Sequence, residues 1–263
     1  MGYQALILRE PARAAATVQE FDRLGITSWC AQLIETIWPE DTAQLERLTE
    51  NLARGGSGWL LLTSVTTVNV LREVLSGRSL PGSLNVAAVG SKTAQAAYEQ
   101  LGTAVDFQPR QQSAAGMVHE WKPEPGSHIW YPHGDLASST LSDFLRLLPV
   151  NLSEVIAYRT VDAGTPGRPV GTGNIPQGLQ LLDPGQIGAK LKELDLVVFS
   201  APSIVRRFRQ LMDGTLPAQV NTLAIGEPTA RALSTAGLPV SITARSPGPD
   251  GLAQAARTVL GIG

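Results

Sequence analysis

Four short turns in this chain combine hydroxyl groups with open helix starts, at points where a strand is expected to give way to a helix. They are Thr63-Ser64, Gly90-Ser-Lys-Thr93, Ser200-Ala201 and Gly226-Glu-Pro-Thr229. The first N–H groups of a helix have no partner inside it and lie at the positive end of its dipole, so they can hold a carboxylate. Ser and Thr are also ordinary N-caps, which is the simpler interpretation of any single turn. Four matched turns together favour a shared anion-binding site.

The turns belong to an internal repeat. Residues 59–71 read WLLLTSVTTVNVL and residues 196–208 read LVVFSAPSIVRRF; residues 86–97 read VAAVGSKTAQAA and residues 222–233 read TLAIGEPTARAL. In both copies an apolar strand, a turn and a helix follow in the same order. Two copies of such a unit predict two similar lobes with a ligand cleft between them.

The elements that would carry these turns are short apolar strands separated by helices. Runs such as LVVF and ALIL are apolar without alternation, which is typical of parallel strands buried on both faces. Helices are expected at 12–24, 42–53, 94–101 and 229–236, and the stretch 162–186 is expected to be an irregular loop because it is rich in Gly and Pro. Ten strands are expected, near 4–8, 28–34, 58–63, 85–89, 104–107, 128–131, 153–158, 195–199, 221–225 and 240–243.

The predicted fold class is therefore α/β. It consists of two similar lobes, each a five-stranded mostly parallel sheet flanked by helices, with a cleft between the lobes.

Composition narrows the classes of protein. The chain has 263 residues, 43% of them hydrophobic and 17% charged, with a net charge of −2. These values suit a globular protein and give no support for binding to nucleic acid or to an anionic membrane. No membrane-spanning run or signal peptide is visible, and Cys30 is the only cysteine. We expect a cytoplasmic protein in which Cys30 is a buried strand thiol.

Several catalytic patterns are absent from the sequence. Gly171-Thr-Gly173 follows no strand, and Gly90-Ser-Lys-Thr93 lacks the glycines of a P-loop. His119, His128 and His133 have no metal-ligand spacing, and we expect His133 to be a solvated loop residue. Neither a cofactor nor a metal is therefore expected.

Taken in order, these segments resemble the uroporphyrinogen-III synthase family over nearly the whole chain. The resemblance rests on the turns at 60–64 and 197–203 and on the segments AAVGSKTAQAAYEQLG, AIGEPTARALSTAGL and EVIAYRT. Two positions depart from the family pattern: Ala201 stands where Ser is usual, and Val65 where Pro is frequent. Arg9 follows the first strand as the family's arginine does, but Glu10 separates it from Pro11.

The resemblance also implies a domain layout that differs from a simple cut between the two repeats. It implies a discontinuous α/β domain of residues 1–36 plus 159–263 and an inserted α/β domain of residues 37–158. A two-stranded linker, near 35–38 and 157–161, would join the two lobes and permit hinge motion.

The chemistry implied by the resemblance is cyclisation of the linear tetrapyrrole hydroxymethylbilane with inversion of its last ring, without a cofactor. Tyr158 would be the catalytic residue, because its protonated phenol can assist departure of the hydroxyl group. A half-buried packing tyrosine is the alternative for this position. The implied substrate-binding residues are Arg9, Thr63, Ser64, Gly90, Lys92, Thr93, Ser200, Ala201, Gly226 and Thr229.

Partners follow from the same resemblance. The expected ligand is the linear tetrapyrrole, the upstream hydroxymethylbilane synthase is an expected partner, and the protein is expected to be a monomer. The departures at Ala201 and Val65 keep one alternative open, a non-catalytic module that binds a tetrapyrrole or a small acid on the same two-lobed fold.

Overall fold

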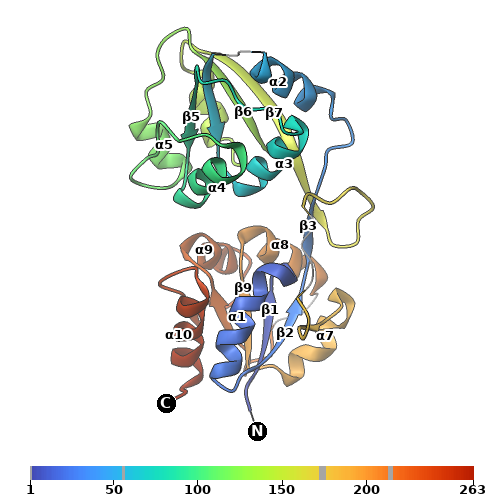
Figure 1. The fold of residues 1–263 in the computed structure, drawn as a ribbon. Coiled ribbons are helices and arrows are strands. Elements are labelled where there is room, and N and C mark those ends of the chain that lie inside the picture. The colour runs from blue at the N-terminus through green and yellow to red at the C-terminus, as the bar shows by residue number, and fades with distance from the viewer. Residues whose placement is uncertain (1, 55–56, 172–175, 213–215) are drawn as a thin grey trace. The chain divides into compact units, whose positions relative to one another are not determined.

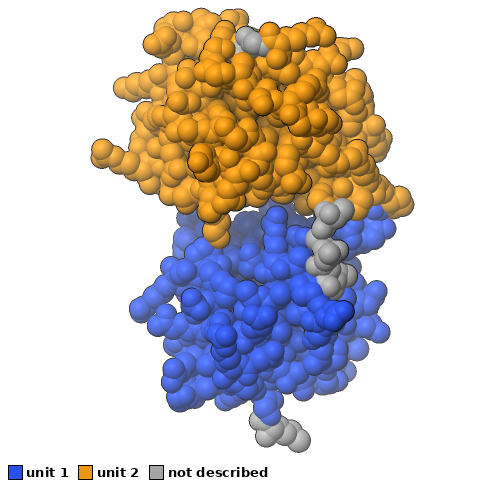
Figure 2. Space-filling view, viewed as in Figure 1, with its two compact units in different colours: residues 1–35, 162–165, 173–263 blue, residues 36–161, 166–172 orange. Residues whose placement is uncertain are grey.

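The computed structural model describes residues 2–54, 57–171, 176–212 and 216–263, and the chain divides into two compact units. Unit 1 comprises residues 1–35, 162–165 and 173–263, and unit 2 comprises residues 36–161 and 166–172. Figures 1 and 2 show the elements and the two units. The chain passes from one unit to the other inside β3, at the end of β7 and twice more between residues 165 and 173.

Unit 1 is built on a sheet with strand order β11-β10-β9-β1-β2-β8, and all of its pairings are parallel. Its strands are β1 Gln4–Leu8, β2 Thr27–Ala31, β8 Gln180–Leu181, β9 Leu196–Phe199, β10 Asn221–Ala224 and β11 Ile242–Thr243. Its helices are α1 Pro11–Arg23, α7 Ile187–Lys190, α8 Pro202–Leu211, α9 Glu227–Thr235 and α10 Pro249–Leu260, with 3₁₀ turns at Pro184–Gln186 and Leu191–Glu193.

Helices cover both faces of this sheet, which is why its strands are apolar without alternation (Figure 1). Ala5 and Ile7 of β1 pack in one cluster with Phe21 of α1 and Ala256 of α10. The alternate residues Leu6 and Leu8 pack in the other, whose helical residues include Ile187, Val205, Phe208 and Leu233 of α7, α8 and α9.

The second sheet lies mostly in unit 2 and has the strand order β3-β7-β6-β4-β5. Its strands are β3 Ile34–Ile37, β4 Gly58–Leu62, β5 Leu84–Ala88, β6 His128–Gly134 and β7 Asn151–Asp162. The helices of unit 2 are α2 Ala43–Ala53, α3 Val65–Leu75, α4 Ser91–Leu101, α5 Ala114–Glu120 and α6 Thr140–Arg146. Helices α2, α3 and α4 pack on the face of Leu60 and Leu62, and α5 and α6 pack on the face of Leu61.

The α/β class and the parallel character of the sheets are confirmed, but three details of the expected strands were wrong. Residues 104–107 form no strand; only Phe107 bridges Ala87. The segment 28–34 ends one strand and begins another, β2 and β3. The expected loop 162–186 contains β8, so the described part of unit 1 has six strands instead of five. Residues 172–175 of that loop lie outside the described residues.

The helix predictions agree with the structure to within a few residues. The expected helices at 12–24, 42–53, 94–101 and 229–236 correspond to α1, α2, α4 and α9. Gly102 ends α4 with a φ of 65°, a left-handed conformation in which glycine has no side chain to clash. None of the described helices is both long enough and apolar enough to span a membrane.

Candidate functional site

A cavity of about 320 Å³ opens at the carboxyl edge of the unit 2 sheet. Because β4, β5, β6 and β7 are parallel, the residues that follow them meet at one edge, where open α/β sheets bind ligands. The lining combines apolar groups with six hydroxyls, and no described lining residue is charged. The lining residues are Thr63, Ser64, Val89, Ala114, Tyr131, Gly134, Leu136, Ala137, Ser138, Leu141, Tyr158 and Thr160.

A β-bulge between β6 and β7 sets the face of the sheet on which Tyr158 lies. His133 pairs with Ile156, but the next residue of β6, Gly134, pairs with Tyr158, so β7 carries one extra residue. Strict alternation from Glu154 would place Tyr158 on the α5 and α6 face of the sheet. In the structure it packs against the cluster of the opposite face.

The ring of Tyr158 lies directly over Gly134. A Cβ atom added at Gly134 would be 2.5 Å from Cε2 and Cζ of Tyr158 and 2.8 Å from its hydroxyl oxygen. A larger residue would fit there only if the ring moved, since real Cβ contacts are not that short. The backbone N–H of Asp135 also donates to the carbonyl oxygen of Tyr158 at 3.0 Å, so a main-chain hydrogen bond stabilises the bulge.

Ser64 is the polar partner of Tyr158. It is the N-cap of α3, where its Oγ accepts a hydrogen bond from the backbone N–H of Thr67 at 3.1 Å. The same oxygen lies 3.1 Å from the hydroxyl oxygen of Tyr158 and 2.9 Å from Oγ1 of Thr67. The cap therefore holds a hydroxyl beside the phenol, in a position to exchange a hydrogen bond with it.

Tyr131 provides a second phenol in the cavity. It is buried, and this burial raises the pKa of Tyr131 to about 12, with Glu154 and Tyr158 adding to the effect and a hydrogen bond with Thr63 opposing it. Its phenol therefore stays protonated at neutral pH and can donate a hydrogen bond.

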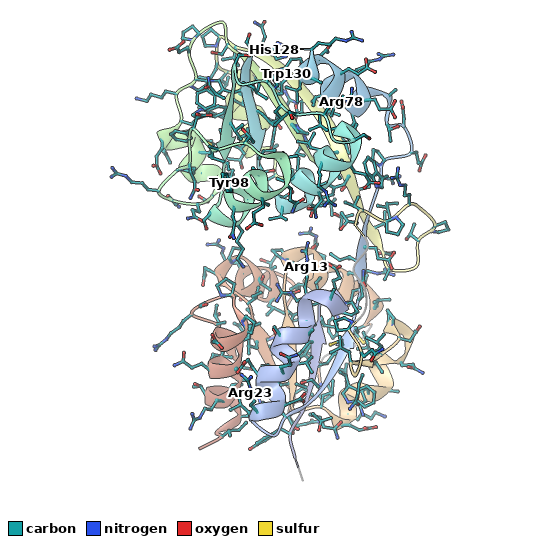
Figure 3. The ribbon with its side chains drawn as sticks, viewed as in Figure 1. Arg13, Arg23, Arg78, Tyr98, His128 and Trp130 are labelled. Atoms are coloured by element: carbon teal, nitrogen blue, oxygen red, sulfur yellow. The ribbon has the colours of Figure 1, made fainter. Side chains whose placement is uncertain are left out.

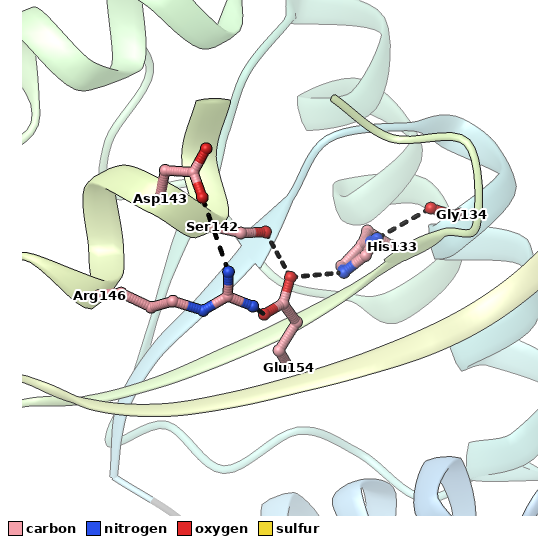
Figure 4. A network of polar contacts seen from close by, with 6 residues as sticks. All are labelled: His133, Gly134, Ser142, Asp143, Arg146 and Glu154. Carbon is pink, nitrogen blue, oxygen red and sulfur yellow. Dashed lines mark hydrogen bonds and ion pairs between the residues drawn. The ribbon is translucent and has the colours of Figure 1, made fainter. Parts of the chain in front are cut away.

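A charged network lies behind the cavity on the α6 side (Figure 4). Nε2 of His133 is 3.0 Å from Oε1 of Glu154, and Nδ1 of His133 is 2.8 Å from the carbonyl oxygen of Gly134. Ser142 donates to the same carboxylate, and Arg146 binds its Oε2 at 2.6 Å. His133 is only 7% exposed, so the expectation of a solvated loop histidine was wrong.

The network sets the ionisation of Glu154. Burial acts to raise the pKa of Glu154, but the hydrogen bond from Ser142 and the charges of Arg146 and His133 outweigh burial and lower it. A carboxylate whose pKa is lower in the folded than in the unfolded protein stabilises the fold above the unfolded pKa, and this contribution is lost as pH falls.

We therefore expect Glu154→Gln to change the acid dependence of stability. The difference in unfolding free energy between wild type and Glu154→Gln should be largest above about pH 5 and should shrink as pH falls below about 4. Urea unfolding across this range measures it. Glu124→Gln, which alters an exposed carboxylate, is the matched control and should run parallel to wild type. A constant difference between wild type and Glu154→Gln would contradict this account.

The unit 1 turns also meet at one sheet edge. Ser200 follows β9. Its Oγ donates a hydrogen bond of 2.7 Å to the carbonyl oxygen of Leu8, the last residue of β1. Ala201 is the N-cap of α8 in an extended conformation and makes no side-chain cap, and Gly226 is the N-cap of α9. The described residues contain no hydrogen-bond acceptor for the N–H of Ala201.

Arg9 lies at the same edge, directly after β1. Its guanidinium is half-buried, and this burial is the main cause that lowers the pKa of Arg9. The nearby charge of Arg13 lowers the pKa further, and the charge of Glu10 acts in the opposite direction. Figure 3 labels Arg13 at the start of α1. Arg13 pairs with Glu10 at 3.1 Å, whereas the described residues offer no ion-pair partner for Arg9. A partly desolvated guanidinium of this kind favours an anionic ligand.

The remaining predicted residues differ in their exposure to solvent. Gly90 is the N-cap of α4 and Lys92 is exposed on its first turn. Thr93 and Thr229 are buried, and their backbone N–H groups already donate to the carbonyls of Gly90 and Gly226, each at 3.0 Å.

The candidate residues thus form two groups, one in each unit, and their roles stay predictions. The unit 1 group is Arg9, Ser200, Ala201, Gly226 and Thr229; the unit 2 group is Thr63, Ser64, Gly90, Lys92, Thr93 and Tyr158.

Other expectations concerned residues outside the cavity. Cys30 is buried in β2, as expected, and burial raises its pKa to about 11, which is unfavourable for a nucleophile. His128 stacks on Trp130 at the start of β6, with ring centroids 3.8 Å apart. Both residues are labelled in Figure 3. Among the described residues, no cluster of His, Cys, Asp or Glu could hold a metal ion.

Four residues of this region were missed from the sequence: Tyr131, His133, Gly134 and Glu154. The available signal was the alternation of HIWYPHG, which puts Tyr131 and His133 on one face of a strand. The contacts of these two residues with Glu154 depend on the register between β6 and β7.

The comparison with known families decides where this chain belongs. A family model described as uroporphyrinogen-III synthase HemD matches residues 15–254. The chain belongs to the uroporphyrinogen-III synthase family. This is a family of tetrapyrrole biosynthesis, and the resemblance stated from the segments around the turns is confirmed.

Solved structures of the uroporphyrinogen-III synthase family have the same fold. A mutant uroporphyrinogen III synthase from the extremely thermophilic bacterium Thermus thermophilus is 18% identical, with a TM-score of 0.67 over 98% of this chain and 99% of that one. The enzyme from Helicobacter pylori is 14% identical, with a TM-score of 0.53 over 98% of this chain and 100% of that one. At such identities the likeness concerns the fold alone.

Proposed function

We propose that this protein is a cofactor-independent hydro-lyase that cyclises hydroxymethylbilane with inversion of ring D to give uroporphyrinogen III. Family membership supports the reaction class. The observation that carries the proposal for this chain is the pair formed by the Tyr158 hydroxyl and Ser64 Oγ, 3.1 Å apart at an uncharged, hydroxyl-lined cavity.

The first chemical step is loss of the terminal hydroxyl of the substrate. The C–O bond of the hydroxymethyl group breaks, the electron pair leaves with oxygen, and the phenol of Tyr158 supplies the proton that turns the leaving group into water. Ser64 donates a hydrogen bond to the phenolate that remains. The resulting N-protonated azafulvene is a cation, and the substituted carbon of ring D attacks it. The spiro intermediate then fragments and recloses, and the proton that the substrate releases as its rings become aromatic again returns to the phenolate of Tyr158.

The enzyme must direct this closure, because spontaneous ring closure gives the other isomer. Catalysis then depends on holding the chain in one conformation and excluding the competing route. We propose that the substrate carboxylates are bound at the helix starts near Ser64, Ala201 and Gly226 and by Arg9, with Lys92 as a further cation. The Ala201 departure is tolerable, since its N–H survives where the family's hydroxyl is lost.

The proposed architecture for this reaction consists of two similar lobes with the ligand cleft between them. It comprises a discontinuous domain of residues 1–36 plus 159–263, an inserted domain of residues 37–158 and a two-stranded linker near 35–38 and 157–161. Narrow linkers would allow closure around a large flexible ligand.

We further propose a monomeric cytoplasmic enzyme that receives its unstable substrate from hydroxymethylbilane synthase.

The test supplies enzymatically generated hydroxymethylbilane and measures the isomer ratio of the uroporphyrinogens formed. We expect predominantly the type III isomer. Formation of type I alone, as in the reaction without the protein, would reject the proposal. Tight binding of the tetrapyrrole combined with that result would favour the non-catalytic binding module.

A further inference from the structure

His133 is a buried histidine whose two ring nitrogens both face hydrogen-bond acceptors. Nδ1 lies 2.8 Å from the carbonyl oxygen of Gly134, and Nε2 lies 3.0 Å from Oε1 of Glu154. A carbonyl oxygen can only accept, so Nδ1 carries a proton and donates it. Glu154 is held as a carboxylate by Ser142 and Arg146, and a carboxylate also only accepts. The two contacts together fix the orientation of the ring.

The elements packed around the ring of His133 carry several ionisable groups. Glu154 and Tyr158 lie on β7 and Tyr131 on β6, with ring centroids of Tyr131 and His133 4.5 Å apart. The packed helix α6 contributes Arg146 and Asp143, which pair with each other at 3.6 Å, and Asp135 follows in the turn. The ionisable residues of α5 are His119 and Glu120, and Glu120 accepts from the amides of Arg110 and Gln111.

The acceptor of the Nδ1 bond is the residue at which the sheet register shifts. Gly134 stands opposite Tyr158 at the bulge, and its missing side chain makes room for the phenol ring. On either side, the amide of Asp135 donates to the Tyr158 carbonyl, and the amide of Thr160 donates to Oδ1 of Asp135, at 3.0 Å and 2.9 Å. His133 thus holds the peptide on which the Tyr158 ring rests.

We propose that His133 is a positioning residue that fixes the Gly134 peptide and, through it, the phenol of Tyr158 beside Ser64. The inference rests on the proposed function as far as it concerns catalysis, since it deepens the role given to Tyr158. Glu154 supports this role because it orients the imidazole from the Nε2 side. Ser142 and Arg146 of α6 in turn hold Glu154. His133 itself does not line the cavity.

Two isosteric substitutions separate the two bonds of His133. The side-chain amide nitrogen of Asn occupies the place of Nδ1, so His133→Asn keeps a donor for Gly134 and loses the contact with Glu154. The amide nitrogen of Gln occupies the place of Nε2, so His133→Gln keeps the contact with Glu154 and loses the donor for Gly134. Both variants remove the aromatic ring and leave a neutral amide, so a purely structural role predicts similar effects.

We expect His133→Gln to lower kcat for cyclisation by about 10²-fold with little change in KM, because misplacing a catalytic group by about 1 Å costs that much. His133→Asn should recover most of this kcat. The melting temperatures of the two variants should be close to each other. Equal losses of kcat in both variants, or a larger loss in His133→Asn, would overturn the proposal.

Amide hydrogen exchange of the free protein tests the positioning independently of activity. Exchange at Asp135 and Thr160 should become faster in His133→Gln and stay near the wild-type rate in His133→Asn. Unchanged exchange in His133→Gln would reject the positioning role even if the wild type forms the type III isomer. If the wild type forms only type I while exchange behaves as expected, the proposed function fails and the role of His133 in the bulge remains.

Discussion

Replacing Tyr158 by Phe is expected to lower kcat for hydroxymethylbilane cyclisation by about 10²–10⁴-fold, or roughly 3–5 kcal/mol of barrier. The variant keeps the ring that packs over Gly134 and loses only the hydroxyl that lies 3.1 Å from Ser64 Oγ. Binding and conformational control do not depend on that proton, so the residual product should still be mainly type III. Steady-state rates and isomer analysis by chromatography measure both effects.

The control for this prediction distinguishes catalysis from packing. Tyr158→Ala removes the ring as well, and should lose stability in addition to activity, whereas Tyr158→Phe should keep the wild-type melting temperature. A Phe variant whose rate is within a few-fold of wild type would remove Tyr158 from the catalytic residues. The family assignment would be unaffected, because it rests on the match over residues 15–254.

Gly134→Ala is expected to lower kcat by about 10²-fold without removing any polar group, because it displaces the phenol. The new Cβ would lie 2.5 Å from two ring carbons of Tyr158. The ring must move, and its hydroxyl must leave its position beside Ser64. Because the atoms in conflict are at the tip of the side chain, the unfolding free energy should fall by only about 1 kcal/mol.

The matched control is Gly82→Ala, where an added Cβ meets nothing within 4 Å. It should leave kcat and the melting temperature unchanged. A double-mutant cycle then tests the route of the effect, because residues in contact are not additive. In the Tyr158→Phe background, Gly134→Ala should cost little further activity. Full additivity of the two losses would show that Gly134 acts on the reaction by some other route.

Both predictions depend on the β-bulge opposite Gly134, which sequence patterns cannot reveal. The alternation of β6 and β7 predicts which residues share a face, and by that rule Tyr158 belongs with Glu154. The bulge opposite Gly134 reverses the face of Tyr158. A bulge is a property of two paired strands, so its position depends on register.

The predicted loop at 162–186 illustrates a different limit. Its Gly and Pro content correctly suggested mostly irregular structure, but Gln180–Leu181 pairs with Trp29 and Cys30 as an edge strand. Two exposed residues carry no periodic pattern, and only the free edge of β2 makes them a strand. The segment 104–107 shows the converse, because Phe107 reaches Ala87 through a single bridge and the bonds of Asp106 to Val86 do not extend it into a strand.

The local features of this protein were determined by its sequence. Apolar runs without alternation specified parallel strands buried on both faces, and Ser64, Gly90, Ala201 and Gly226 marked the starts of α3, α4, α8 and α9. These features depend on residues that are near one another in the chain. The repeat and the family resemblance depend on the same short segments, which is why they could be recognised without coordinates.

Tertiary structure alone decided how the chemistry of unit 2 is assembled. The Ser64–Tyr158 pair joins residues 94 positions apart, and the His133–Glu154 contact joins two strands across the register of the sheet. Such contacts require both loop closure and a specific register, and neither leaves a local signal in the residues concerned. The sequence therefore determined which residues stand at the carboxyl ends of the strands, and the packing of β6 and β7 decided which of them meet.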